Sequence, residues 1–200
     1  MPQPVTFRPR GGVVLAAIAI AVCGIGVVAT AVSDGANGLL AWGWPIALLA
    51  WGAWLLYIHP SVQVTDGFVE IVNPLRTHRV PWGDITGVES RYALTVETAD
   101  RSIRAWAAPA PSARRALLTR REEVSRTPGE GDTRRPADAE GTESGDAAAI
   151  VRRALDRYRR EGGPQLPGGT ASTWQFWPIV VTAVLAGATV LSLAQQAAHG

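Results

Sequence analysis

The chain has 200 residues, with 19 basic and 17 acidic side chains, and its charge is strongly segregated along the sequence. Nearly all of the charge lies in residues 59–173, and this part is almost balanced, which argues against nucleic acid as a partner. The single cysteine, Cys23, excludes an internal disulfide and a cysteine metal cluster. Three stretches hold no Asp, Glu, Lys or Arg: residues 11–33, 35–58 and 174–200.

The first two uncharged stretches predict a transmembrane helical hairpin over residues 12–58. Gly12–Ser33 and Leu39–Ile58 are each close to the roughly 20 residues that cross a bilayer, and only a short polar turn separates them. A cleaved signal peptide is the alternative for the first stretch, because Ala29-Thr30-Ala31 resembles a cleavage site. The apolar run is longer than the usual core of a signal peptide, so we favour a membrane span.

The third uncharged stretch predicts a C-terminal transmembrane helix over residues 174–194. Trp51 and Trp54 lie deep in the second span, where they either line a ligand groove or pack against neighbouring helices, and we favour packing. Other aromatic residues suit the belts at membrane interfaces, namely Trp42, Trp44, Tyr57, Trp174 and Trp177.

The distribution of basic residues orients the spans. Arg8 and Arg10 precede the first span, whereas the turn around Asp34 has no positive charge. By the positive-inside rule, the N-terminus and residues 59–173 are cytoplasmic and the C-terminus is external. We therefore expect a multi-pass protein of the cell membrane.

Residues 59–125 predict a small antiparallel β domain followed by a short helix. Apolar and polar residues alternate in short runs, as in strands with one buried face, and Asp66-Gly67 is a hairpin signal. Ser112 is a candidate cap for a helix that ends near Val124. The expected strands are Val62–Thr65, Phe68–Val72, Arg76–Trp82, Tyr92–Glu97 and Ser102–Trp106.

Two details of this domain concern its turns and edges. Asn73-Pro74-Leu75-Arg76 predicts a turn in which Asn73 hydrogen-bonds the backbone just beyond it. Pro81 donates no ladder hydrogen bond, so we expect its strand at an edge of the sheet.

The region after the β domain predicts a disordered acidic linker and an amphipathic helix. Residues 126–146 have no aromatic or large aliphatic side chain to bury. Residues 147–161 carry an apolar stripe and five arginines. This helix either caps the β domain or lies on an anionic membrane surface, and we favour the cap because short helices gain most of their stability by docking.

The pattern of residues 62–106 resembles the bacterial PH-like domain family of the type of low molecular weight protein antigen 6 of actinobacteria. The matching pieces are Val62-x-Val64, Asp66-Gly67, Val69-x-Ile71, Asn73-Pro74-Leu75-Arg76, and Val80-Pro81-Trp82 followed by Ile85 and Val88. The resemblance implies a bent antiparallel sheet closed by a helix. It brings no catalytic residues. In many PH domains, a basic loop between the first two strands recognises phosphoinositides. Here that loop is Thr65-Asp66-Gly67, which carries an acidic residue, so the resemblance does not imply phosphoinositide recognition.

No constellation of residues predicts an enzyme, a metal site or a cofactor site. His59, His78 and His199 are scattered, and no Ser or Cys stands in a nucleophile motif. We expect Trp82 to be an anchor in the core or at its rim, with contact to a ligand as the alternative. The candidate interaction surface comprises Arg76, His78, Trp82 and Trp106.

The sequence therefore predicts an α+β membrane protein with three transmembrane helices, a PH-like β domain and a capping helix. We expect a non-enzymatic module, bound to the lipid bilayer, that binds a protein partner or organises a complex at the cytoplasmic face. The alternative is an accessory subunit of a membrane transporter or a cell-envelope complex, with the spans as its working surface.

Overall fold

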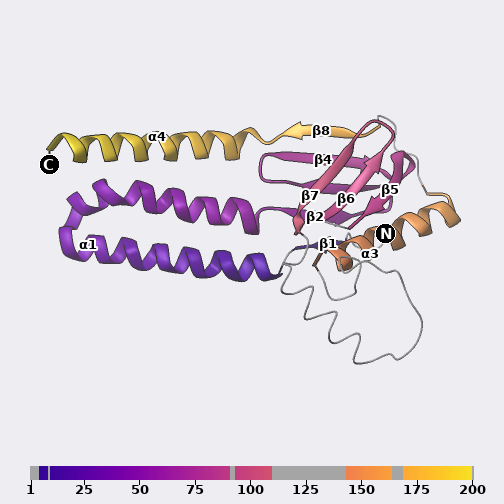
Figure 1. Ribbon diagram of the computed structural model, residues 1–200, viewed down its shortest axis with the longest axis horizontal. Coiled ribbons are helices and arrows are strands. Elements are labelled where there is room, and N and C mark those ends of the chain that lie inside the picture. The colour runs from indigo at the N-terminus through magenta and orange to yellow at the C-terminus, as the bar shows by residue number, and fades with distance from the viewer. Residues whose placement is uncertain (1–4, 9, 91–92, 110–142, 164–168, 200) are drawn as a thin grey trace, which may run out of the picture. The chain divides into compact units, whose positions relative to one another are not determined.

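A computed structural model describes residues 5–8, 10–90, 93–109, 143–163 and 169–199 of the chain. The chain divides into two compact units (Figure 1). The β unit lies within Met1–Pro9 and Pro60–Thr173, and the helical unit lies within Arg10–His59 and Trp174–Gly200.

The β unit contains two antiparallel sheets. The first has five strands in the order β1-β2-β3-β4-β8, and the second has three in the order β5-β6-β7. The strands of the first sheet are β1 (Val5–Phe7), β2 (Ser61–Val64), β3 (Phe68–Val72), β4 (Arg76–Pro81) and β8 (Ala171–Trp174). The strands of the second are β5 (Ile85–Glu89), β6 (Ala93–Thr98) and β7 (Ser102–Pro109), and the short 3-10 helix η2 (Trp82–Asp84) joins β4 to β5.

The helix α3 (Glu143–Glu161) completes the core between the two sheets. Its apolar stripe is buried together with inward-facing residues of both sheets. The alternating apolar residues of the strands and the apolar residues spaced by 3.6 along the helix therefore form one core. The buried residues of α3 are Ala147, Ala148, Val151 and Leu155. The expected cap over the sheets is therefore present, and the helix begins four residues before the expected Ala147.

The strands β1, β5 and β8 were not among the strands expected from the sequence. Phe7 lies opposite Val62, which makes β1 the outer neighbour of β2. The β8 strand lies beside β4, so β4 is an inner strand and the expectation that Pro81 marks a sheet edge is wrong. Pro81 is tolerated there because it is the last residue of β4.

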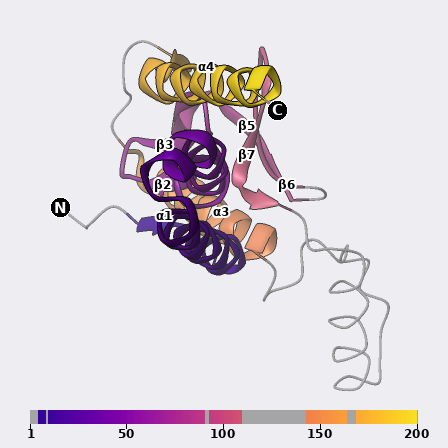
Figure 2. The ribbon, with the colours of Figure 1, turned by 90° about the vertical axis from the view of Figure 1, so that its left-hand side faces the viewer.

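The helical unit contains α1 (Arg10–Ala53), the π-helical turn η1 (Trp54–Ile58) and α4 (Phe176–His199). Figures 1 and 2 show α1 doubling back into two antiparallel arms, with α4 alongside. Only Gly35 inside α1 has non-helical backbone angles, with φ 58° and ψ −138°. A Cβ atom built on Gly26 would lie 3.5 Å from Ile46 Cδ1, so the arms are in side-chain contact.

Two helices are long and apolar enough to cross a membrane by length and composition, Gly11–Ile58 and Phe176–Ala198. Three separate transmembrane helices were expected, whereas the structure has two helices of this kind. The break at Gly35 is one residue wide, so the first two expected spans form one bent helix.

Two expected segments fall partly or wholly outside the described residues. The short helix at 112–124 and most of the acidic linker at 126–146 lie there. The last four residues of that linker, 143–146, belong to α3 and are helical, because the helix starts one turn earlier than its apolar stripe.

Candidate functional site

All three chain segments that lead to the helical unit leave the β unit from one end of its five-stranded sheet. Ser61 pairs with Val72, and Val72 pairs with Thr77, so these three residues form the last row at that end. The Thr173 hydroxyl donates to the carbonyl of Thr77 at 3.5 Å, and Phe7 lies one row further in. We call this the connecting end of the sheet.

The turn beyond this row, Asn73 to Arg76, is tied to the second sheet by a side chain. The amide of Asn73 donates from Nδ2 to the carbonyl of Arg104 at 3.0 Å, and its Oδ1 accepts from the backbone N–H of Trp106 at 2.8 Å. The expected bond from Asn73 to the backbone just beyond it is replaced by this bridge. The turn itself closes through Asn73 N–H to Arg76 carbonyl at 2.8 Å.

The bridge brings two exposed apolar side chains and two exposed arginines to the connecting end. Leu75 is 40% exposed and Trp106 is 53% exposed, and Arg76 and Arg104 are exposed as well. Residues 73–76 and 104–106 contain no Asp or Glu. We define the connecting-end surface as Leu75, Arg76, Arg104 and Trp106. It combines a flat aromatic ring, an aliphatic side chain and positive charge.

His78 lies just inside this surface. It pairs with Ile71 and faces the same way as buried Val80, two residues along β4. Its Nδ1 atom is buried and has no hydrogen-bond partner among the described residues. Burial lowers the pKa of the His78 imidazole, and the charges of Arg76 and Arg101 lower it further.

Trp82 is hydrogen-bonded to the turn of the β2–β3 hairpin, at the end opposite the connecting end. Its side chain is 2% exposed, its Nε1–H donates to the carbonyl of Thr65 at 3.0 Å, and its backbone N–H donates to the carbonyl of Gly67 at 3.2 Å. This is the role of a core anchor. The burial of Trp82 removes it from the candidate interaction surface.

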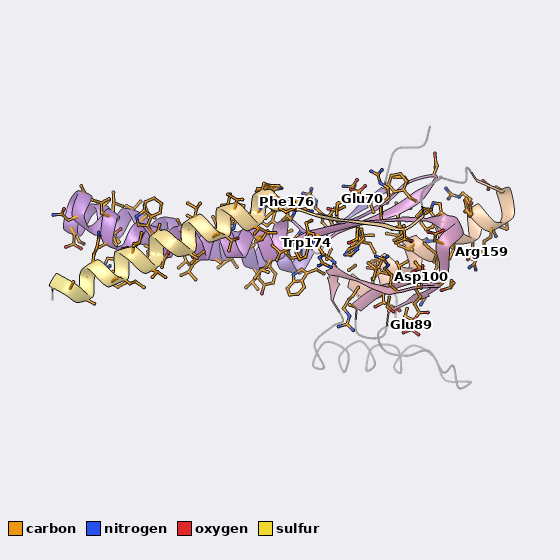
Figure 3. All side chains as sticks on the ribbon, turned by 90° about the horizontal axis from the view of Figure 1, so that it is seen from above. Glu70, Glu89, Asp100, Arg159, Trp174 and Phe176 are labelled. Carbon is orange, nitrogen blue, oxygen red and sulfur yellow. The ribbon has the colours of Figure 1, made fainter. Side chains whose placement is uncertain are left out.

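Two arginines of α3, Arg152 and Arg159, bond the backbone of β5. Arg152 donates from Nη2 and Nε to the carbonyl of Val88, at 3.0 and 3.3 Å. Arg159, labelled in Figure 3, donates from Nη2 to the carbonyl of Ile85 at 3.3 Å. Because β5 is an edge strand, these bonds occupy carbonyls that would otherwise be open to another strand.

The helical unit has an aromatic cluster between the end of α1 and the start of α4. Trp51 and Trp54 stack at 5.1 Å between ring centroids, and both contact the ring of Trp177, at 5.5 and 5.6 Å. His59 lies 5.1 Å from Trp54 and bonds Gln175 Oε1 at 2.6 Å through Nε2. The tryptophans therefore pack within the chain, as we favoured, instead of lining a groove.

Titratable side chains do not gather into a metal-binding group within the described residues. His59 belongs to the helical unit and His78 to the β unit, and the side chain of His199 lies outside the described part of the chain.

Of the four expected site residues, Arg76 lies in the β3–β4 turn, His78 lies two residues along β4, and the backbone N–H of Trp106 is joined to this turn by Asn73. Leu75 and Arg104 were not among the residues expected from the sequence. Alternation along β7 already places Arg104 and Trp106 on one face, and this signal could have identified Arg104. Leu75 carries no such signal, because its position depends on the turn.

Comparison with known proteins supports the assignment of the β unit. A search of curated proteins and a search of solved structures each found no match. A family model described as a bacterial PH domain matches residues 59–157, which span β2 to β7 and most of α3. The β unit is therefore similar to the bacterial PH domain family.

Proposed function

We propose that this chain is a membrane-anchored PH-like module that presents its β unit to partners at the cytoplasmic face. The observation that carries the proposal is the common exit of three chain segments from the connecting end, each leading into an apolar helix. Only two residues separate β1 from α1, and only Gln175 separates β8 from α4. Such short connections suit a domain held close to a bilayer.

The proposed topology has three crossings. Each arm of α1, the second taken through η1 to Ile58, is about as long as the roughly 20 residues that a bilayer requires. The third crossing is α4. Arg8 and Arg10 place the N-terminus and the β unit inside and the C-terminus outside.

The proposed action is binding, without catalysis. The β unit uses these polar side chains to join its own strands and helix, as the bonds of Trp82, Asn73 and Arg152 illustrate. We further propose that the domain is of the low molecular weight protein antigen 6 type of actinobacteria, on the strength of the motif around Asn73-Pro74-Leu75-Arg76.

The second candidate is an accessory subunit of a membrane transporter or a cell-envelope complex, with the spans as its contact surface. Exposed apolar residues along α1 and α4 favour it. Trp51 and Trp54, which would have supported it most strongly, are occupied by contacts within the chain.

The topology is tested by cysteine labelling in intact cells. In a Cys23→Ser background, Gly35→Cys should react with a membrane-impermeant maleimide, whereas Asp66→Cys should react only after permeabilisation. Asp66 is exposed, so protection there reports the membrane and not burial in the protein. Release of the chain by alkaline carbonate, or the reverse labelling pattern, contradicts the proposal.

Partner choice is tested by in-cell crosslinking of three forms: the full chain, a chain with α1 and α4 replaced by unrelated spans, and a chain with a disrupted β unit. The first proposal requires that partners survive replacement of the spans and are lost with the β unit. The opposite result supports the accessory subunit.

A further inference from the structure

We infer that the connecting-end surface of Leu75, Arg76, Arg104 and Trp106 rests on an anionic lipid surface. This inference deepens the proposed function, because it rests on membrane anchoring and names the surface that the anchored domain uses. It assigns the lipid contact to the β3–β4 turn and to β7, and not to the basic helix α3.

Chain connectivity is the first argument. The turn that carries Leu75 and Arg76 follows Val72, which pairs with Ser61 in the last row of the sheet. Ser61 comes two residues after His59, where the helical unit ends. A chain extends at most about 3.6 Å per residue, so Ser61 lies within about 7 Å of His59 along the chain.

Side-chain chemistry is the second argument. Trp106 and Leu75 are exposed apolar groups at this end, and tryptophan is favoured at the level of lipid headgroups. Arg76 and Arg104 add two positive charges with no acidic residue in either segment, and Arg8 adds a third beside Phe7. This combination matches an anionic leaflet, which attracts basic side chains that lie near it.

The backbone is prepared for this contact. The Asn73 side chain fixes the turn to β7 through its bonds to the Arg104 carbonyl and the Trp106 N–H, so the backbone that carries Leu75 and Trp106 is already ordered. A surface that is already ordered loses less conformational entropy when it binds.

The helix α3 is the competing lipid contact, and its own contacts place it elsewhere on the β unit. Arg159 bonds Ile85 carbonyl, and Tyr158 lies beside Gly83, both next to η2. Trp82 of η2 bonds the turn at Gly67, which is at the far end of the β2–β3 hairpin from Ser61. The last turns of α3 therefore lie toward the end opposite the connecting end.

The test uses the full chain in lipid nanodiscs with single spin labels. In a Cys23→Ser background, labels at Pro74→Cys and Asp66→Cys report the two opposite ends of the β unit, and retained protease resistance verifies the fold. Leu75→Cys is the second labelling position if Pro74→Cys disturbs the turn. The readout is the ratio of oxygen to aqueous nickel-complex accessibility.

In discs with phosphatidylglycerol, the ratio should be high at position 74 and low at position 66. Changing Arg76 and Arg104 together to Gln should reduce the contacting population about fivefold for each arginine, whereas Arg157→Gln with Arg160→Gln should leave it unchanged. In discs of phosphatidylcholine alone, the parent chain should make a contact as weak as that of the variant with Arg76→Gln and Arg104→Gln.

Three outcomes overturn the inference: equal accessibility at positions 74 and 66, loss of contact with the α3 variant, or contact at position 74 only in native membranes, which indicates a protein partner. A label on native Cys23 separates these failures from failure of the anchor. If Cys23 is in a lipid environment and position 74 is not, anchoring stands and only the inference fails. If Cys23 is exposed to water, the proposed function fails.

Discussion

The side-chain oxygen of Asn73 accepts a 2.8 Å hydrogen bond from the backbone N–H of Trp106, which lies 33 residues later in the chain. With the bond from Asn73 Nδ2 to Arg104 carbonyl, the amide imitates a strand neighbour for β7. One turn residue thus joins the two sheets beside the proposed lipid contact.

Asn73→Ala should destabilise the β unit by about 1–2 kcal/mol, because it removes two hydrogen bonds that each contribute about 1 kcal/mol net. Asn73→Asp keeps the acceptor for Trp106 and loses the donor to Arg104, so its loss should be intermediate. Pulse proteolysis of the full chain in detergent measures both values. Equal stability of Asn73→Ala and the parent chain would contradict the bridge.

Val151→Asp should destabilise the β unit by roughly 3–5 kcal/mol, because it leaves an unpaired charge in the core. Val151 is fully buried between the sheets and α3. The control changes Arg157 and Arg160, which are exposed on α3, together to Gln and should have little effect on folding. Protease resistance is the measurement, and an unaffected Val151→Asp variant would remove α3 from the core.

Arg152→Gln and Arg153→Gln form a matched pair on α3. Arg152 bonds the carbonyl of Val88 across to β5, whereas the bond of Arg153 among the described residues is to the carbonyl of Ala149 in its own helix. Arg152→Gln should cost about 1–2 kcal/mol, and it should accelerate hydrogen exchange in β5. Arg153→Gln should leave both quantities unchanged. Equal effects in the two variants would argue against a specific edge contact.

Acidification should destabilise the β unit through His78. The folded-state pKa of His78 lies below its ordinary value, so the unfolded chain binds more protons between the folded value and about 6.5. Stability should therefore rise with pH across this window and be lost as the pH falls through it. His78→Gln should flatten this part of a stability–pH curve, and Arg76→Gln should reduce its depth. Identical curves for His78→Gln and the parent chain would refute the assignment.

Gly38→Ala and Gly43→Ala test the bend in α1. A Cβ atom on Gly38 would lie 2.8 Å from the carbonyl oxygen of Thr30 and 2.7 Å from Asp34 Cβ, whereas one on Gly43 meets nothing within 4 Å. Gly38→Ala should lower stability in detergent by about 1–3 kcal/mol through crowding. Gly43→Ala should be neutral or stabilising, since Ala favours helix. The measurement is thermal unfolding followed by helical circular dichroism.

The sequence by itself determined the local elements, because their signals are periodic and short in range. Alternation located β2, β3, β4, β6 and β7 to within a few residues, and the apolar stripe from Ala147 identified the helix that covers them. The uncharged stretches identified the apolar helices. A helix that is to cross a bilayer needs about 20 consecutive apolar residues with few or no charges, and such a run is visible in the sequence.

Tertiary structure alone decided which distant segments meet. Val5–Phe7 and Ala171–Trp174 are too short to show a period, and they become strands only because β2 and β4 offer free edges. The bond from Asn73 to Trp106 and the burial of Trp82 also depend on positions far apart in sequence. Pairings of this kind are set by the whole core and by chain closure, and a single window of sequence contains neither.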